Sequence, residues 1–427
     1  MREMKDSGVE WIGSVPESWR IHTIGSLFKV RNEKVNDTDY PPLSVSKGGI
    51  VPQMDNVAKT DARDNRKKVQ QNDFVINSRS DRKQSCGLSS LTGSVSLINI
   101  VLYAAENAPL APAYVNYLLK NYGFAEEFYR WGHGIVADLW TTRWQEMKSI
   151  LLPVPSEGDQ EAIAQAIDSK LTKVDALISN VQAQIEKLKA YKQSLITEVV
   201  TKGLDPTVPM KDSGVEWIGE IPDGWVITKA GRFIFNTQNG LTRRDLSESS
   251  GAIVLKMKNI SADGVLDYNI VNRISLDDKE KNTYALQTGD ILFVRVNGSK
   301  NLVGKCAVFE GFPELVAYND HIIRVKLKSS LIYSFFKWYL LGAAGKTEID
   351  QRTSTSAGQY TISGRDLKDI IMCVPSYEEQ REIVSYLDSK CAQIDRLIAI
   401  KQEKITKLEQ YKRSLIYEYV TGKKEVK

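Results

Sequence analysis

Two long stretches of the chain carry apolar residues at alternating spacings of three and four, the pattern of helices that pack side by side. Residues 159–202 and 377–421 contain neither proline nor glycine, so each helix could run for about 40 residues, roughly 60 Å at 1.5 Å per residue. A single domain offers too little surface to cover such a helix, and we therefore predict that the two helices pair with each other. The seam residues are Ile167, Leu171, Val174, Ile178, Val181, Ile185, Leu188, Leu195 and Val199 in the first helix, and Leu387, Cys391, Ile394, Ile398, Ile405, Leu408, Leu415 and Tyr419 in the second, which Lys401 interrupts.

The chain also repeats itself at both ends of each half. The decapeptide MKDSGVEWIG occupies residues 4–13 and again residues 210–219. A second repeated block begins at Val154 and at Val374 and contains the two helices. Gene duplication followed by drift would explain a repeat, but uniform drift would not keep these ends and scramble the centres between them. We therefore favour the interpretation that the two centres recognise different things.

Both centres contain short apolar runs separated by turns, which predicts α/β domains with many short strands. The offset between matching residues rises from 206 to 220 across the centres, so the second centre is longer by 14 residues. Between the two halves, Gly203, Pro206 and Pro209 predict a short turn. We expect a first domain at 1–153, a first long helix at 154–203, a linker and second domain at 204–373, and a second long helix with the C-terminal tail at 374–427.

The predicted fold class is α+β, with two α/β domains separated by two long helices that pair as an antiparallel coiled coil. Antiparallel pairing would give the chain an internal pseudo-twofold axis. Symmetric proteins use such an axis to match the local dyad of duplex DNA.

The net charge of the 427 residues is only +4, which by itself does not indicate a nucleic-acid partner. The two centres differ from the rest of the chain, however. Residues 20–153 contain 17 Lys and Arg against 13 Asp and Glu, and residues 226–373 contain 20 against 15, so their net charges are +4 and +5. The remaining residues carry 20 against 25, a net of −5. Basic domains suit phosphate backbones, although a solvated surface of mixed charge is the alternative explanation.

Composition excludes several other classes of protein. Hydrophobic residues make up 42% and charged residues 26% of the chain, which is typical of globular proteins that bury a core. The four cysteines form no CxxC pair, so neither a disulfide framework nor a zinc site is predicted, and we expect a reducing, cytoplasmic location. The longest uncharged stretch, residues 84–105, is rich in Ser, Gly and Asn and indicates strands and turns rather than a membrane segment.

Polar loops follow matching apolar strands in the two centres. Asp73 and Asp290 each open such a strand, and residues 78–84 and 295–301 follow it. Another loop, residues 352–360, follows a predicted aromatic helix at 333–341 and corresponds to residues 132–140 in the first half. Arg, Asn and Gln in such loops can make bidentate hydrogen bonds to base edges, although solvent-exposed turns would look the same. The candidate DNA-binding residues are Lys47, Arg79, Arg82, Lys83, Gln84, His133, Lys256, Lys258, Asn259, Arg295, Asn297, Lys300, Asn301, Arg352, Thr353, Thr355, Gln359 and Tyr360.

The sequence shows little sign of catalytic chemistry. Residues 342–347 resemble the end of a phosphate-binding loop. The first glycine of such a loop is missing, because Leu340 stands in its place. Similarly, Gly132, His133 and Gly134 follow an aromatic helical stretch and indicate a turn rather than a dinucleotide site. The three histidines lie far apart, and neither a nucleophile nor a metal signature surrounds them. We therefore expect no catalytic, cofactor or metal site in this chain.

The layout resembles the DNA-specificity subunit of type I restriction-modification systems. The resemblance rests on the doubled head SGVEWIGxxPxxW, the TGDILF strand at residues 288–293, and the doubled VPSxxxQxxI entry into helices ending YKQSLITEVV and YKRSLIYEYV. It implies two target recognition domains that each read half of an asymmetric bipartite DNA site, held apart by helices that act as a ruler. It also implies docking of two methyltransferase (modification) subunits and of restriction (translocase-nuclease) subunits. S-adenosylmethionine, ATP and magnesium would be used by those partners.

Two other classes of function stay open from the residues alone. The chain could be a coiled-coil scaffold or adaptor with two protein-binding domains and no DNA role. It could also be an enzyme with an unrecognised site, which would require methylation or cleavage of DNA by the purified chain.

Overall fold

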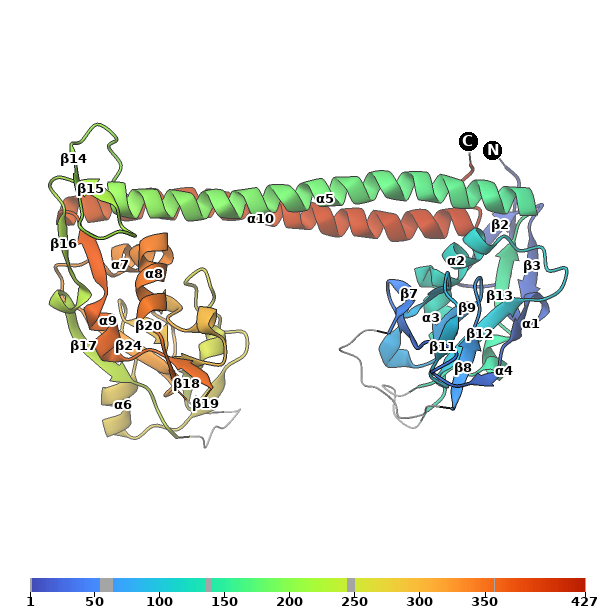
Figure 1. The fold of residues 1–427 in the computed structure, drawn as a ribbon, viewed down its shortest axis with the longest axis horizontal. Helices are drawn as coiled ribbons and strands as arrows, with labels where there is room; N and C mark the ends of the chain where they lie inside the picture. Colours follow the sequence, from blue (N-terminus) through green and yellow to red (C-terminus); the bar gives the residue numbers. More distant parts are fainter. Residues whose placement is uncertain (1, 54–63, 135–139, 244–249, 357, 427) are drawn as a thin grey trace. The chain divides into compact units, whose positions relative to one another are not determined.

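The computed structural model describes residues 2–53, 64–134, 140–243, 250–356 and 358–426 (Figure 1). The chain forms two compact units. Unit 1 contains residues 1–182 and 402–427, and unit 2 contains residues 183–401. Each long helix therefore belongs partly to unit 1 and partly to unit 2. Both units combine sheets with helices, which confirms the predicted α+β class.

Unit 1 is built on a central four-stranded antiparallel sheet. Its elements are β1 (Met4–Asp6), β2 (Ser14–Pro16), β3 (Arg20–Thr23), α1 (Ile24–Leu27), β4 (Phe28–Val30), β5 (Lys34–Val35), β6 (Leu43–Ser46), β7 (Gly49–Pro52), β8 (Arg66–Val69), β9 (Phe74–Asn77), η1 (Ser80–Arg82), β10 (Cys86–Leu88), β11 (Gly93–Val95), β12 (Asn99–Ala104), α2 (Pro112–Lys120), α3 (Tyr122–Arg130), α4 (Trp144–Met147) and β13 (Leu151–Val154). The central sheet has the order β10-β9-β12-β4, and a second sheet has the order β11-β8-β5. The pairs β1-β2, β3-β13 and β6-β7 complete the described strands of this unit.

Unit 2 repeats this plan with different residues. Its elements are β14 (Met210–Asp212), β15 (Glu220–Pro222), β16 (Val226–Lys229), η3 (Ala230–Arg232), β17 (Ile234–Asn239), β18 (Ala252–Leu255), η4 (Met257–Asn259), β19 (Asn272–Ile274), α6 (Asp278–Tyr284), β20 (Ile291–Val294), β21 (Val296–Asn297), η5 (Lys300–Leu302), β22 (Cys306–Val308), β23 (Val316–Tyr318), β24 (Ile322–Leu327), α7 (Tyr333–Leu341), α8 (Ala343–Arg352), β25 (Ser354–Ser356), β26 (Gln359–Thr361), α9 (Gly364–Asp369) and β27 (Ile371–Val374). The four-stranded sheet has the order β22-β20-β24-β17, which matches β10-β9-β12-β4 strand for strand. The remaining sheets are β19-β18-β23, β21-β26-β25, β14-β15 and β16-β27.

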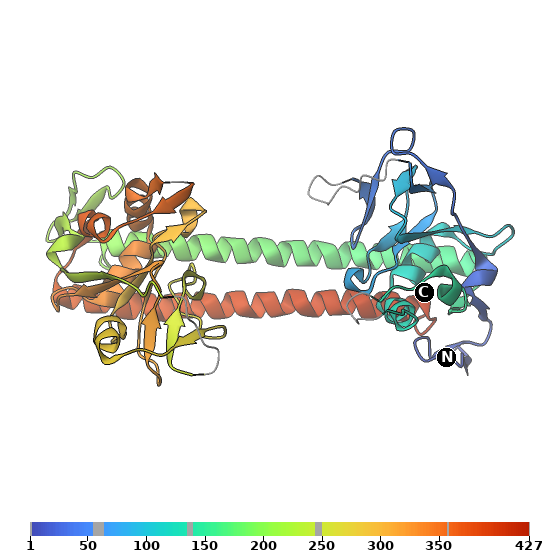
Figure 2. The same ribbon diagram turned by 90° about the horizontal axis from the view of Figure 1, so that it is seen from below.

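The two long helices are α5 (Glu157–Lys202) and α10 (Tyr377–Val420). They lie side by side within each unit in both views (Figures 1 and 2). In unit 1 the Lys412 ammonium donates to the Asp175 carboxylate, and in unit 2 the Lys192 ammonium lies 2.7 Å from Asp395. Lys192 and Lys412, like Asp175 and Asp395, are equivalent residues of the repeat. The same ion pair therefore forms twice with its partners exchanged between helices, which confirms antiparallel pairing.

The repeated heads, which continue past the decapeptides to Trp19 and Trp225, pack against the end of a long helix. Trp19 is buried in the core of unit 1 with Leu415 and Val420 from the end of α10. Its counterpart Trp225 is buried in the core of unit 2 with Val200 from the end of α5. Each head therefore packs against the tail of the other repeat. This packing explains why heads and tails are retained together in the sequence.

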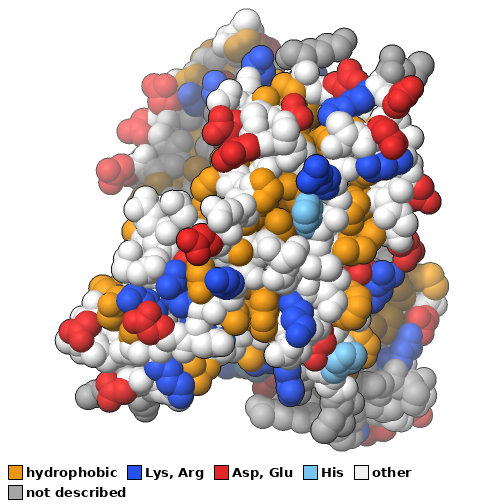
Figure 3. All heavy atoms as spheres, turned by 90° about the vertical axis from the view of Figure 1, so that its right-hand side faces the viewer, with side chains coloured by type: hydrophobic (Ala, Val, Ile, Leu, Met, Phe, Trp, Pro, Cys, Tyr) orange, Lys and Arg blue, Asp and Glu red, His pale blue; other side chains and the backbone are white. Residues whose placement is uncertain are grey.

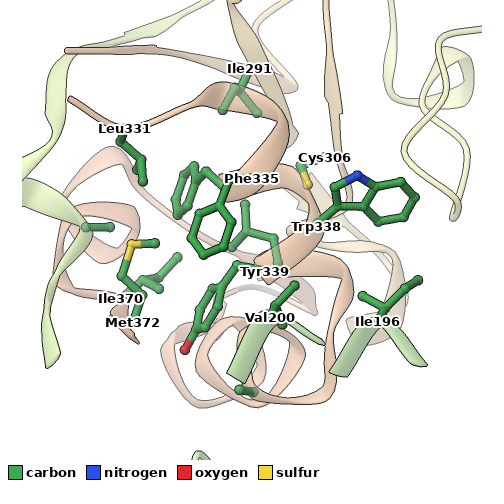
Figure 4. Packing of buried hydrophobic residues seen from close by; sticks show 14 of the residues in the cluster. Ile196, Val200, Ile291, Cys306, Leu331, Phe335, Trp338, Tyr339, Ile370 and Met372 are labelled. Carbon is green, nitrogen blue, oxygen red and sulfur yellow. The ribbon is translucent and has the colours of Figure 1, made fainter. Parts of the chain in front are cut away.

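The core of unit 2 shows how helix and sheet share one apolar interior (Figure 4). Ile196 and Val200 project from α5 toward Trp338 and Tyr339 of α7, with Ile291 of β20 on the far side of the cluster. The predicted aromatic helix at 333–341 is thus confirmed as a buried element with the bounds of α7. Among the described residues, no helix combines the length and apolarity needed to cross a membrane.

The cysteines of the two sheets occupy equivalent buried sites. Cys86 begins β10 and Cys306 begins β22, and each strand pairs with the strand opened by the matched aspartate. Burial raises the pKa of each thiol to about 12. All four cysteines are free and buried. These thiols therefore act as small apolar side chains of the core.

Candidate nucleic-acid interface

In unit 2, two candidate loops far apart in the sequence meet in one small sheet. Strand β26 pairs with β21 on one side, where Asn297 lies opposite Tyr360, and with β25 on the other, where Thr355 lies opposite Tyr360. The backbone amide of Ile362 also donates to the carbonyl of Arg295 at 3.0 Å. The loop after β20 and the loop after α8 therefore form a single polar surface.

The same two places meet in unit 1 through isolated bridges. Thr141 pairs with Arg79 and with His133, just as Thr361, its repeat equivalent, pairs with Val296 and Ser354. The backbone amide of Ser80 donates to the carbonyl of Trp140 at 2.8 Å. Part of the predicted loop at 132–140, residues 135–139, lies outside the described residues, as does Ala357 in the loop of unit 2.

The polar side chains of unit 2 divide into exposed and partly buried groups. Lys258, Lys300, Asn301, Thr355 and Gln359 are exposed. The side chains of Lys256, Arg295, Asn297 and Tyr360 are intermediate in exposure. The exposed amides and ammonium groups can hydrogen-bond base edges or phosphates, because their donors face solvent.

Several candidates of unit 2 stabilise the protein itself, and Asn259 is the most buried of them. Its side chain is 3% exposed, accepts from the backbone amide of Lys256, and donates to the carbonyls of Asp267 and Ile270. These bonds hold its own loop, and a role in reading bases stays a prediction. Asn297 donates to the sulfur of Met257 at 3.2 Å and accepts from the amide of Ser299.

Arg352 and Thr353 also face inward. The Arg352 guanidinium lies 2.6 Å from the buried Glu348 carboxylate and donates to the carbonyl of Asp369 at 2.7 Å. The Thr353 hydroxyl donates to the carbonyl of Ile349. Both residues therefore fix the end of α8, and the base-reading role of Arg352 stays a prediction. Arg295 likewise donates to the carbonyl of Asp320 at 3.1 Å.

The basic residues after β9 in unit 1 are tied into ion pairs at the surface. The Arg79 side chain lies 3.0 Å from Asp81, and the Lys83 ammonium lies 3.0 Å from Glu126. Arg82, 67% exposed, is 3.7 Å from Asp81. Exposed pairs of this kind contribute little stability and exchange partners readily. Gln84 adopts a positive φ of 62° at the end of the turn.

A recess beside this loop is lined by two candidate residues and by others that the sequence did not indicate. Its volume is about 560 Å³, and it is lined by Lys47 and Arg82 together with Arg66, Ser44 and Asn99. Burial lowers the pKa of Arg66, whose guanidinium donates to Ser94 at 2.8 Å. The basic run at residues 66–68 was the available signal for this residue. His133 is exposed outside this recess.

A buried aspartate lies directly before the strand that leads into each loop. Asp73 accepts from the amide of Gln70, and Asp290 accepts from the amide of Gln287 in the matching turn. Asp73 also forms a two-bonded ion pair with Arg31, at 2.8 and 3.0 Å. Asp290 forms a longer ion pair, with Lys326 at 3.9 Å, and burial raises its pKa although the charges of Lys326 and Arg324 oppose that shift. The prediction that these residues open equivalent strands is confirmed.

On the one face that Figure 3 shows, the surface charge is mixed rather than uniformly positive. On the face shown in Figure 3, Lys and Arg side chains alternate with Asp, Glu and apolar side chains. No group of three or more His, Cys, Asp or Glu side chains within the described residues could hold a metal ion. The polar loops are therefore the feature of each unit that best fits a recognition role.

Comparisons with known proteins agree with these observations. A family model described as the type I restriction modification DNA specificity domain matches residues 234–410. The chain is 28% identical over 274 residues to the type I restriction enzyme StySPI specificity subunit of Salmonella potsdam, covering 64% of this chain and 57% of that protein. It is 26% identical over 251 residues to the EcoKI specificity subunit of Escherichia coli strain K12, covering 58% and 52%. The matches thus span little more than half of these relatives.

A solved structure supports the fold over almost the whole chain. It comes from work on complex assembly and conformational transition of the type I R-M system, and it covers 95% of this chain and 98% of its own. The TM-score is 0.69 at 16% sequence identity, which is a likeness of fold. Residues 234–410 thus match the type I restriction modification DNA specificity domain, and the chain is similar in sequence to type I specificity subunits.

Proposed function

We propose that the chain is the sequence-specific DNA-binding subunit of a type I restriction-modification complex, and that each unit reads one half of a bipartite, asymmetric site. One observation carries this proposal. Both units bring the same two loops together on the same framework of strands, yet the exposed side chains of those loops differ. A common framework with different loops is what two readers of different half-sites require.

The chemistry of the loops supports a division of labour between bases and phosphates. In unit 2, Asn301 and Gln359 carry exposed amides that suit adenine edges, and Lys258 and Lys300 carry exposed ammonium groups. In unit 1, Lys47 and Arg82 offer exposed donors at the recess, and His133 is exposed outside it. Contacts to phosphate position the protein, and contacts to base edges supply the specificity.

The long helices would set the spacer between the half-sites. One helical turn adds about 5.4 Å and one base pair adds about 3.4 Å. Inserting about four residues at equivalent levels of α5 and α10 should therefore lengthen the preferred spacer by one or two base pairs. An unchanged spacer preference in such a variant would contradict the ruler.

The same proposal assigns catalysis to partner subunits. Two methyltransferase subunits would dock on this chain, and restriction subunits would join the full complex. S-adenosylmethionine, ATP and magnesium would be bound by those partners, and this chain would contribute recognition. Methylation or cleavage of DNA by the purified chain alone would contradict this assignment.

The half-site proposal is tested in two steps. Mapping methylated adenines in the host genome gives the two half-sites, and binding of the assembled methyltransferase complex is then measured on duplexes altered in one half at a time. Asn301→Ala should weaken binding by roughly 1–3 kcal/mol per lost bidentate contact and relax specificity in one half only.

Arg396→Ala is the matched control, because Arg396 is an exposed residue on the α10 segment of unit 2, away from the loops. It should leave specificity in both halves unchanged. Swapping residues 20–153 for the equivalent segment of another specificity subunit should change the other half-site. Altered recognition of both halves by either change would overturn the proposal of independent readers.

A further inference from the structure

Unit 1 differs from unit 2 at the end of its central sheet. In unit 1, Asn99 of β12 lies opposite Asn77 of β9. In the matching sheet of unit 2 the equivalent residues are Ile322 of β24 and Val294 of β20, which also lie opposite each other. Both of these apolar residues are buried in the core of unit 2. The shared framework accepts an apolar pair at this place, so the fold by itself does not require two asparagines.

Both asparagines line the recess of about 560 Å³ beside the loop after β9. Asn99 is 3% exposed, and its Nδ2 donates to the carbonyl of Ser96 at 3.1 Å. Its Oδ1 is buried and has no hydrogen-bond partner among the described residues. An unpaired buried acceptor destabilises the folded state, and a bound donor would offset that cost.

Asn77 complements Asn99 at the recess. The Asn77 side chain is partly exposed, and its Oδ1 accepts from the backbone amide of Arg79 at 3.1 Å. Its Nδ2 is therefore the group left to contact a ligand. Asn77 and Asn99 together offer one donor and one acceptor, the combination that the edge of a nucleobase such as adenine matches.

Arg66 adds a buried positive charge to the same recess. Its side chain is 6% exposed, and the guanidinium donates only to Ser94, through Nε at 2.8 Å and Nη2 at 3.1 Å. Burial lowers the pKa of Arg66 although the charge of Asp37 opposes that shift. No carboxylate of the described residues forms an ion pair with it. A buried guanidinium without such a partner suits a bound anion, and phosphate is the anion that arginine binds best in a planar, two-bonded geometry.

The rest of the lining fits the other parts of a nucleotide. Lys47 and Arg82 add exposed cations, and Leu43 and Val45 add apolar surface that can cover the face of a base. Asp81, the acidic residue among the described lining residues, lies 3.7 Å from the Arg82 guanidinium. The volume of the recess exceeds what one phosphate group needs and lies in the range of small-molecule sites, roughly 300–1,000 Å³.

The position of these groups decides how DNA can reach them. The edges of stacked bases lie inside the grooves of a duplex, where protruding helices or strands contact them. Asn99 and Arg66 are instead buried side chains of a recess, so a base that stays in the stack does not reach them. A nucleotide that has left the stack can enter such a recess. The recess also borders the recognition loop, because Asn77 ends β9 and Arg82 belongs to the loop that follows.

We propose that the recess of unit 1 binds one extrahelical nucleotide of the half-site, with Arg66 on its phosphate and with Asn77 and Asn99 on the edge of its base. The inference rests on the proposed function and adds the form in which one nucleotide is read. This nucleotide would be distinct from the adenine that the methyltransferase partner modifies. Unit 2, with Ile322 and Val294 at the equivalent positions, would read its half-site without this step.

The test uses the full chain assembled with its methyltransferase partner. Duplexes carry one fluorescent base analogue, 2-aminopurine or pyrrolocytosine, at each unmethylated position of the half-site that unit 1 reads. Because stacking quenches these analogues, fluorescence should rise at one position when the wild-type complex binds. The variant N77V/N99I carries the residues that unit 2 has at the equivalent positions. It should abolish this rise and weaken binding roughly tenfold.

The phosphate contact is tested separately. Arg66→Gln should reduce the slope of log affinity against log salt by about one, because one phosphate contact is lost. Lys47→Gln changes only an exposed side chain of the recess and should lower affinity without affecting the sheet. Peptide-resolved hydrogen exchange should show that unit 1 keeps its protection in each variant.

Asn32→Ala is the matched control, because Asn32 is an exposed asparagine of unit 1 outside the lining of the recess. It should leave the fluorescence rise and the affinity unchanged. A rise at no unmethylated position, or one that persists in N77V/N99I, would overturn the recess while leaving half-site recognition intact. A complex that binds DNA without sequence preference would overturn the proposed function as well.

Discussion

Unit 1 and unit 2 fold centres of dissimilar sequence into the same sheet, β10-β9-β12-β4 in one and β22-β20-β24-β17 in the other. By contrast, their heads share an identical decapeptide and their tails share many residues, and heads and tails pack against each other in the two cores. The strands tolerate exchange of one apolar residue for another as long as the buried pattern is kept. The polar side chains of the loops are not held by a buried pattern, and they differ between the two units.

The comparison also shows where equivalent positions use different chemistry for the same structural purpose. Asp73 is neutralised by a two-bonded Arg31, whereas no described residue makes such a two-bonded pair with Asp290, whose ion pair with Lys326 is 3.9 Å long. In unit 2 the indole of Trp217 donates to Glu348, whereas the indole nitrogen of its counterpart Trp11 is buried without a partner among the described residues. The two units should therefore respond differently to matched substitutions.

The largest difference is expected at the matched aspartates. Asp73→Asn removes a charge that pairs with Arg31 and should lower the free energy of unfolding of unit 1 by about 3 kcal/mol, because a partly buried guanidinium loses its partner. Asp290→Asn should cost about 1 kcal/mol or less in unit 2. Hydrogen exchange resolved by peptide reports each unit separately. Equal losses in the two units would contradict the difference in pairing.

A second difference is expected at the glycines that follow the long helices. Gly422 and Gly203 both have positive φ, 74° and 77°. A Cβ at Gly422 would lie 2.3 Å from Cδ of Pro16, but one at Gly203 would lie 3.3 Å from the Trp225 ring. Gly422→Ala should therefore cost about 2–3 kcal/mol from strain and overpacking together.

Gly203→Ala is the control with the same backbone strain and a milder contact, and it should cost about 1 kcal/mol. Urea unfolding followed by hydrogen exchange in each unit measures both values. If Gly203→Ala proved the more damaging substitution, the close contact with Pro16 would not be the cause.

The long helices were predictable from the sequence because the spacing of their apolar residues is a local, periodic pattern. Seven-residue spacing and the absence of proline predicted a helix ending at Lys202, and α5 ends there. The aromatic run at 333–341 likewise matched α7, because its length and composition are those of a buried helix. Antiparallel pairing was also predicted, and the ion pairs Lys192–Asp395 and Lys412–Asp175 confirm it.

The site was less predictable because its contacts are distant in sequence. The pairing of Asn297 with Tyr360 joins two loops that no local periodicity relates. Asn259 was chosen for its amide, but its position three residues after Lys256 is that of a turn-capping side chain. Arg352 was chosen for its charge, and its buried partner Glu348 four residues earlier was the missed signal.

A smaller difference is expected at the matched tryptophans. Trp217→Phe leaves the buried Glu348 carboxylate without its indole donor and should cost unit 2 about 1–2 kcal/mol more than Trp11→Phe costs unit 1, since both lose similar ring volume. Peptide-resolved hydrogen exchange again separates the units. A larger loss for Trp11→Phe would show that ring packing, not the hydrogen bond, dominates at these positions.

The smallest difference is expected in the pH dependence of unit 2. Burial raises the pKa of Asp290 above its ordinary value of 3.8, and burial also raises the pKa of Glu348 above 4.5. As pH rises past these ordinary values, the unfolded chain loses both protons before the folded unit does. The folded unit then binds more protons, so its stability falls with rising pH until the folded carboxylates also ionise. Asp290→Asn should reduce this dependence of stability on pH, and the part that remains should come from Glu348. Urea unfolding midpoints between pH 4 and pH 7 measure the dependence. An unchanged slope in Asp290→Asn would show that Asp290 ionises in the folded unit as it does in the unfolded chain. Asp73 and Asp290 would then differ only in the geometry of their ion pairs.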